Sequence, residues 1–200
     1  MKRALVLLAA GLALAPAAAS AAERSLLVNG DSLAEGTRPY IPPELPGWKV
    51  RQSTAVSRHA YQGDDVMRRY GSRLPRVIHV SLGTNDDPGN VDGFRAAIAD
   101  VMKVAGGRRC VVWANIVRPP YRGVSYRGYN RALAEESSRR DNLRVLNWVR
   151  MVRAHPDWLA GDGVHVSAEG YEARAEAVAR SVRRCRPAAP APAPAPPPAP

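Results

Sequence analysis

Three short polar clusters hold the residues of this 200-residue chain that could perform covalent chemistry. The clusters are Gly30–Leu33 (GDSL), Gly83–Asp86 (GTND) and Asp162–His165 (DGVH). A serine hydroxyl attacks an ester only when a base removes its proton, and a histidine imidazole within hydrogen-bond reach is suited to that task. A carboxylate three residues before the histidine can bond its far ring nitrogen. Ser32, His165 and Asp162 are therefore a candidate set for nucleophilic catalysis.

Each cluster also has an ordinary structural explanation when it is taken alone. A serine at the end of a strand is commonly the N-cap of the next helix, which would explain Ser32. Asn85 and Asp86 are typical turn residues. The spacing of Asp162 and His165 is common by chance. The catalytic interpretation therefore depends on whether the fold brings the three clusters together.

Short apolar segments alternate with segments of helical period, which predicts an α/β domain. Strands are predicted over residues 25–28, 48–53, 77–82, 110–117 and 143–148. Helices are predicted over residues 64–73, 91–105, 129–140 and 168–184. Ser167 is the expected N-cap of the last helix. Residues 38–48 contain four prolines, so any helix after Ser32 must be short.

The third and fourth predicted strands are apolar almost throughout, as strands are when helices cover both faces of a parallel sheet. We therefore predict a single α/β domain with a doubly wound, flavodoxin-like sheet of five parallel strands and helices on both faces. Ligands of such sheets bind outside the carboxyl ends of the strands. The three clusters are expected to meet there. Arg118–Tyr121 (RPPY) lies at the same edge and either lines a pocket or forms a rigid loop.

The three clusters, in this order, resemble the SGNH, or GDSL-type, hydrolase superfamily of esterases, lipases and acyl-transferring relatives. The resemblance covers the whole folded part of the chain. It implies that Ser32 is the nucleophile, that His165 moves the proton and that Asp162 orients the imidazole. It also implies an oxyanion hole formed by the backbone N–H of Ser32, a backbone N–H after the second strand and the side chain of Asn85.

The chain departs from the family pattern after the second strand, where residues 57–63 read SRHAYQG. Ser57 stands where the family has glycine, six positions before Gly63. Any residue except proline supplies a backbone N–H, but serine restricts the backbone angles and crowds the approach. We therefore predict that Ser57 is the second oxyanion donor, in a hole of altered shape.

The remaining histidines lack the spacing of metal ligands, and the sequence has no H-E-x-x-H motif and no cysteine cluster. His59 is expected to bond locally in a loop, with contact to substrate as the alternative. His79 is expected in the core and His155 in a surface turn. Asp31 and Asp86 are expected to hold loops by accepting from backbone N–H groups. We therefore predict a mechanism without metal or cofactor.

Both ends of the chain have compositions unlike that of a folded domain. Residues 1–22 combine a basic start, an alanine-rich apolar stretch and a small-residue end, which predicts a secretory signal peptide, with an uncleaved anchor as the alternative. Residues 187–200 are almost only Pro and Ala and predict an extended, disordered tail. The hydrolase domain is assigned to residues 23–186. We expect a secreted or periplasmic protein of the bacterial envelope, without stable membrane insertion after cleavage.

Cys110 and Cys185 are the only cysteines, and in an exported chain they predict one disulfide. Cys110 begins the fourth predicted strand, at the edge opposite the site. The last helix leaves the site after His165 and runs for about 27 Å, which returns Cys185 to that edge. A disulfide that closes so long a loop contributes about 4 kcal/mol on the chain-entropy model.

The chain has a formal net charge of +11, which favours contact with anionic polymers. Its arginines are dispersed and aromatic residues make up only 6%, so we expect no nucleic-acid partner. We predict a monomeric hydrolase of small or carbohydrate-borne carboxylic esters, acting through an acyl-enzyme on Ser32. The same residues fit an O-acyltransferase of envelope polysaccharide. A non-catalytic glycan-binding protein with this fold is a further alternative.

Overall fold

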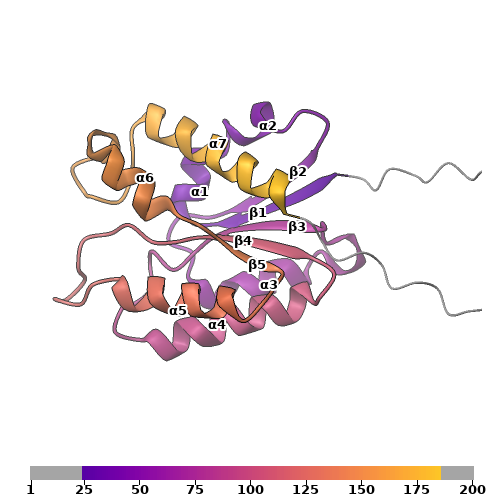
Figure 1. The fold of residues 1–200 in the computed structure, drawn as a ribbon, viewed down its shortest axis with the longest axis horizontal. Coiled ribbons are helices and arrows are strands. Elements are labelled where there is room, and N and C mark those ends of the chain that lie inside the picture. Colours follow the sequence, from indigo (N-terminus) through magenta and orange to yellow (C-terminus); the bar gives the residue numbers. More distant parts are fainter. Residues whose placement is uncertain (1–23, 186–200) are drawn as a thin grey trace, which may run out of the picture.

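The computed structural model describes residues 24–185, so the predicted signal peptide and the Pro/Ala tail lie outside the described residues. At its centre is a sheet of five parallel strands in the order β2-β1-β3-β4-β5 (Figure 1). The strands are β1 (Ser25–Gly30), β2 (Lys49–Thr54), β3 (Val77–Ser81), β4 (Cys110–Ala114) and β5 (Leu143–Leu146). This architecture confirms the doubly wound, flavodoxin-like sheet predicted from the sequence.

Helices cover both faces of the sheet (Figure 1). One face carries α3 (Gly63–Arg68), α4 (Val91–Ala105) and α5 (Arg127–Ser138). The other face carries α1 (Ser32–Thr37), α2 (Ile41–Glu44), α6 (Trp148–Ala154) and α7 (Ala168–Arg184). Short 3₁₀ turns cover Ala60–Gln62, Gly71–Arg73 and Pro156–Trp158. None of the helices within residues 24–185 combines the length and apolar character needed to cross a membrane.

One predicted helix is shorter than expected. The helix predicted over residues 64–73 is α3, which ends at Arg68, and a 3₁₀ turn follows. Gly71 has a φ of 52°, in the left-handed region, so the chain cannot continue as a right-handed helix there. Ser167 caps α7 as predicted, since its Oγ accepts a hydrogen bond from the N–H of Gly170 at 3.2 Å.

Side chains that alternate along the strands divide the interior into two cores. On β3, Ile78 and Val80 belong to the core under α3, α4 and α5, while Val77 belongs to the core under α1 and α7. Phe94 and Ile98 of α4 enter the first core at the helical spacing expected from the sequence. Burial on both faces explains why the central strands are apolar almost throughout.

The order of the strands reverses between β1 and β3, because the chain passes from β1 to the edge strand β2 and then returns to the far side of β1. In open parallel sheets the crevice for a ligand lies at such a reversal, outside the carboxyl ends of the strands. The GDSL and GTND clusters follow these two strands. The topology therefore positions both clusters at the crevice.

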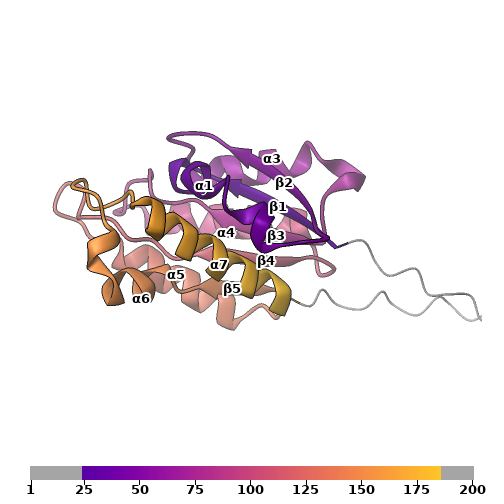
Figure 2. The same ribbon diagram turned by 90° about the horizontal axis from the view of Figure 1, so that it is seen from above.

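A disulfide joins Cys110, at the start of β4, to Cys185, at the end of α7. The two Cα atoms are 5.9 Å apart. Helix α7 runs along the sheet back to the end at which the described chain begins (Figure 2). The pairing predicted from the position of the cysteines is therefore confirmed.

His79 is buried in β3, as predicted. Its Nδ1 lies 3.0 Å from the carbonyl oxygen of Val112, so the ring nitrogen donates to that oxygen. Burial, reinforced by the positive charge of Arg174, lowers the pKa of His79 to about 3. The folded protein therefore holds this imidazole in its neutral form at all but strongly acidic pH.

The neutral His79 predicts a component of acid lability. Between about pH 6.5 and pH 3 the unfolded chain binds a proton at this residue that the folded chain does not. The free energy of unfolding therefore decreases by up to about 1.4 kcal/mol for each unit by which the pH is lowered. His79→Asn keeps an N–H for Val112 and removes the titration. In urea denaturation the variant is expected to be less stable at pH 7, and its deficit should shrink toward pH 4. A deficit independent of pH would contradict this assignment.

Candidate active site

Ser32 is the first residue of α1, directly beyond β1. The N-cap of this helix is Asp31, whose Oδ1 accepts a hydrogen bond from the N–H of Leu33 at 3.0 Å. A Cβ at Gly30 would lie only 2.2 Å from the Cβ of Ala34, so glycine permits the close turn from strand to helix. The hydroxyl of Ser32 is therefore not used for capping, which removes the ordinary explanation of this serine.

The structure brings Ser32, His165 and Asp162 into one hydrogen-bonded chain. His165 Nε2 lies 2.9 Å from Ser32 Oγ, although the two residues are 133 positions apart in the sequence. His165 Nδ1 lies 2.6 Å from Asp162 Oδ2. Because a carboxylate can only accept a hydrogen bond, Nδ1 must carry the proton that it donates to Asp162. Nε2 is then free to accept a proton from the serine hydroxyl.

A tight turn before α7 holds the carboxylate of Asp162. Its Oδ1 accepts hydrogen bonds from the backbone N–H groups of Val164, at 2.9 Å, and His165, at 3.0 Å. The hydrogen bond from the His165 ring, followed by these two backbone donors, lowers the pKa of Asp162 to about 2. The group is therefore a carboxylate at neutral pH and can balance positive charge on the imidazole.

Asn85 lies in the loop that follows β3. Its Nδ2 donates to the carbonyl oxygen of Arg58 at 3.3 Å, and an amide nitrogen carries a second N–H. The hydroxyl of Tyr126 holds the loop, because its single proton is shared between the carbonyl oxygens of Thr84, at 3.2 Å, and Asp86, at 3.0 Å. Asn85 is therefore a fixed donor beside Ser32, and both residues line the same cavity.

Ser57 has a φ of 60°, in the left-handed region that favours glycine. The backbone at this position therefore has a conformation that suits the glycine of the family pattern. Arg58 fixes the loop to the end of β1, because its guanidinium donates to Gly30 O at 3.2 Å and to Asn29 Oδ1 at 3.3 Å. Nothing in the local sequence pattern indicates that the side chain of Arg58 turns back to β1, so this contact was not predicted.

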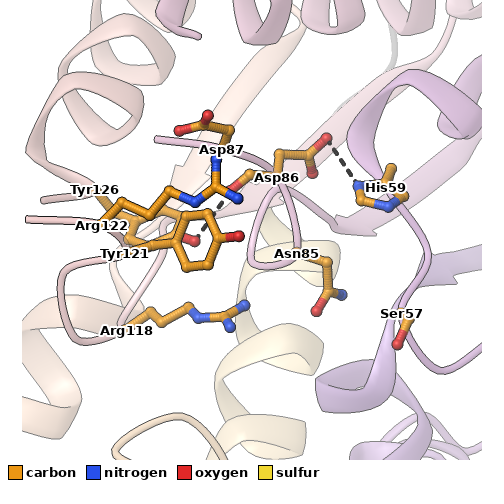
Figure 3. Close-up of a pocket in the computed structure, with 9 residues that line it drawn as sticks. All are labelled: Ser57, His59, Asn85, Asp86, Asp87, Arg118, Tyr121, Arg122 and Tyr126. Carbon is orange, nitrogen blue, oxygen red and sulfur yellow. Dashed lines mark hydrogen bonds and ion pairs between the residues drawn. The ribbon is translucent and has the colours of Figure 1, made fainter. Parts of the chain in front are cut away.

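Asp86 joins the loops that follow β2 and β3, as predicted. Its Oδ2 accepts from the backbone N–H of Ala60 at 3.0 Å, and its Oδ1 lies 3.4 Å from His59 Nδ1 (Figure 3). Burial raises the pKa of Asp86, while the Ala60 N–H and His59 oppose that rise. His59 therefore bonds locally, and it also lines a cavity.

Two adjoining cavities open at this edge of the sheet. The first, here called the serine cavity, has a volume of about 300 Å³ and is lined by Ser32, His165 and Asn85, among others. The second, the side cavity, has a volume of about 510 Å³ and is lined by Ser57 and His59, among others (Figure 3). The two cavities share a wall formed by Asn85, Arg118 and Tyr121. The RPPY segment therefore lines the site.

Arg174 is a second residue that the sequence analysis missed. It lies on α7, is 2% exposed, and donates from Nη2 to Ser81 Oγ at 3.0 Å. Its guanidinium carbon is 4.6 Å from the centre of the Trp148 ring. Gly170, Arg174 and Val178 recur at intervals of four along the buried side of α7, and this spacing was the signal for a buried charge.

The sheet order and the position of the serine define a class of fold. The chain has the fold of the GDSL- or SGNH-type esterases and acylhydrolases, which confirms the fold expected from the resemblance. The C-terminal catalytic domain of the Streptococcus pneumoniae peptidoglycan O-acetyltransferase A superposes with a TM-score of 0.65 at 20% identity, over 82% of this chain and 92% of that domain. A GDSL-like lipase from Bacteroides thetaiotaomicron gives a TM-score of 0.61 at 18% identity, over 81% and 88%.

Curated proteins with similar sequences are also found. A Staphylococcus aureus (strain COL) protein named for a proposed O-acetyltransferase activity is 24% identical over 162 residues. The match covers 79% of this chain and 25% of the relative. The chain thus spans about a quarter of the length of the curated relatives it matches. No family model matches the chain.

Proposed function

We propose that the protein is a serine esterase that hydrolyses carboxylic esters through an acyl-enzyme on Ser32. The observation that carries this proposal is the hydrogen-bonded chain from Ser32 through His165 to Asp162, at a cavity open to solvent. The nucleophile, the base and the orienting carboxylate are joined by hydrogen bonds, and this arrangement activates a serine.

In the first half of the proposed reaction, Ser32 Oγ attacks the ester carbonyl while His165 Nε2 takes the hydroxyl proton. Asn85 Nδ2 and the backbone N–H groups of Ser32 and Ser57 donate to the resulting oxyanion. The tetrahedral intermediate expels the alcohol, which receives its proton from His165. An acyl group then remains on Ser32, and Asp162 holds the imidazole in the required tautomer.

In the second half, water attacks the acyl-enzyme and His165 accepts one of its protons. The second tetrahedral intermediate forms at the same oxyanion donors. Its collapse releases the carboxylic acid and returns the proton from His165 to Ser32 Oγ. The cycle restores every group to its starting state, and it requires no metal or cofactor.

An O-acyltransferase is the second candidate function. It differs only in the final acceptor, because a sugar hydroxyl in place of water would attack the same acyl-enzyme. The observation in its favour is the likeness to two proteins named for O-acetyl transfer, one in sequence and one in fold. The side cavity next to Ser32 offers space for such an acceptor.

We also propose that the protein acts outside the cytoplasm. The support for this location is the composition of residues 1–22 and the pairing of Cys110 with Cys185. Disulfides persist mainly in oxidising compartments. An envelope location would place the site near carbohydrate-borne esters.

The proposal is tested by supplying the full chain with p-nitrophenyl acetate and, in parallel, with a serine-directed phosphonate. Nitrophenol release that the phosphonate blocks, with the adduct mapped to Ser32 by mass spectrometry, would support the esterase. Product analysis with an added oligosaccharide separates the candidates: free acetate indicates hydrolysis, and an acetylated sugar indicates transfer. No turnover and no adduct would leave the non-catalytic glycan-binding alternative.

Asn85→Ala is expected to lower kcat by about 10² to 10³-fold, because it removes one donor to the oxyanion. KM for the same nitrophenyl ester should change little, since the donor acts on charge that develops after binding. The measurement is steady-state kinetics beside a urea unfolding curve, which checks that the Asn85 to Arg58 contact is not essential for folding. A decrease in kcat below about threefold would assign Asn85 a structural role only.

A further inference from the structure

A row of adjoining cavities extends from the proposed active site along the edge strand β2. The side cavity shares Ser57 and His59 with a cavity of about 400 Å³ between the loop after β2 and α3. That cavity in turn shares Val66 and Arg69 with one of about 260 Å³ beside β2. We call these last two cavities the β2 groove. It borders the side cavity, which in turn borders the serine cavity.

The β2 groove is lined by more cations than anions. The charged residues that line it are Arg51, Arg58, Arg69, Arg73 and Asp65. Within residues 24–185, Arg51, Arg69 and Arg73 form no ion pair with a carboxylate, whereas the adjacent Arg68 pairs with Asp64 at 3.1 Å. Arg51, Arg69 and Arg73 are therefore available to an anionic ligand, whereas the guanidinium of Arg58 is held by acceptors at the ends of β1 and β2.

Arg51, Arg69 and Arg73 line one of the two cavities, and Arg69 also lines the other together with Arg58. Burial and the neighbouring Arg69 guanidinium lower the pKa of Arg58, so the two charges are near enough to repel. Arg51 lies over the ring of Tyr70, with its guanidinium carbon 6.0 Å from the ring centre. Arg51 lies three residues before Thr54, the last residue of β2, and three residues of an extended strand cover about 10 Å. Arg51 is therefore about 10 Å from the end of the strand that faces the site. A ligand that contacts both Arg51 and the site at Ser32 must be long.

We propose that the β2 groove binds a linear polysaccharide bearing carboxylate or phosphate groups, whose acyl esters then reach Ser32. That this polymer is the substrate rests on the proposed function, whereas its binding in the groove does not. A small ester would occupy the serine cavity alone and would have no contact with Arg69 or Arg73. The groove therefore distinguishes a polymeric substrate from a small one.

The shape and lining of the β2 groove favour a glycan over other polyanions. Proteins that hold single-stranded nucleic acid combine a basic groove with aromatic side chains on which bases stack. The β2 groove has Tyr70 as a lining aromatic residue besides His59, and its ring already faces Arg51. A membrane surface is flat, whereas these cations line a concave channel. A chain of sugars with spaced anionic groups fits this channel.

The test measures binding of an oligogalacturonate by calorimetry to the full chain carrying Ser32→Ala, so that turnover plays no part. In this background, Arg69→Gln with Arg73→Gln is expected to weaken binding about 10-fold, the effect of losing one charge-assisted hydrogen bond. The matched control is Arg144→Gln with Arg153→Gln, two exposed arginines outside the groove. The control should change the dissociation constant less than twofold.

Three results would overturn the proposal. The first is that oligogalacturonate does not bind. The second is an equal loss of affinity in both double variants, which would indicate an effect of net charge alone. The third is tighter binding of a single-stranded oligonucleotide, with affinity lost in the groove variant only. Circular dichroism excludes misfolding as the cause of a loss. Because binding is read without turnover, an inactive protein that still binds through the groove would disprove the esterase and leave the binding site standing.

Discussion

Replacing Ser32 with alanine is expected to lower kcat for p-nitrophenyl acetate by about 10⁶-fold, the scale at which a serine nucleophile and its base act as one unit. Alanine removes the hydroxyl that lies 2.9 Å from His165 Nε2 and leaves the fold intact. KM should stay near its wild-type value, because the cavity that binds the ester is unchanged. The measurement is nitrophenol release under saturating ester.

Two further variants make this result specific. Asp162→Asn is expected to lower kcat by about 10⁴-fold, because an amide favours the wrong tautomer of His165. Ser138→Ala is the matched control, since this exposed serine on α5 bonds only to the nearby Glu135 carbonyl. Residual activity of one tenth or more in Ser32→Ala would show that another group performs the chemistry.

The parts of this fold that depend on local pattern could be predicted from the sequence. The five strands were recognisable from apolar runs, and α4 from its helical spacing, because these patterns reflect which faces are buried. The meeting of Ser32 and His165 followed from a general property of parallel sheets, whose strand ends share one edge. The disulfide followed from the same reasoning applied to the opposite edge.

The parts that depend on distant partners could not be predicted. Ser57 was expected to restrict the backbone angles and crowd the approach to the oxyanion hole, but no neighbouring residue signals the left-handed φ of 60° that it adopts. Arg58 turns back to β1, and Arg174 points into the core, because each finds hydrogen-bond acceptors on strands far away in the sequence. Long polar side chains have many conformations, so their targets are known only after the fold is built.

Two buried residues of opposite charge, Asp31 and Arg174, interact electrostatically without forming an ion pair in direct contact. Asp31, the N-cap of α1, is buried, and burial raises its pKa to about 6, while the positive charge of Arg174 is the main influence that lowers it. Arg174 is 2% exposed and its Nε and Nη1 form no hydrogen bond within residues 24–185. Its charge is thus compensated mainly by Asp31.

Arg174→Met is expected to destabilise the protein by about 3 to 5 kcal/mol at pH 8, because a buried carboxylate then remains without its partner. The loss should be smaller at pH 5, below the pKa of Asp31, where the folded protein holds this carboxyl protonated and no charge is left unpaired. Urea denaturation at the two pH values measures both effects. Arg180→Met, on the exposed side of α7, is the matched control and should cost less than about 1 kcal/mol.

The double variant Asp31→Asn with Arg174→Met separates the charge from the packing. Asparagine keeps an oxygen that can accept from the N–H of Leu33, so the cap of α1 is retained. Because neither charge remains, most of the stability lost in Arg174→Met should return, and the dependence on pH should disappear. Equal stability losses at pH 5 and pH 8, with no recovery in the double variant, would mean that Arg174 serves only to fill space beside Trp148.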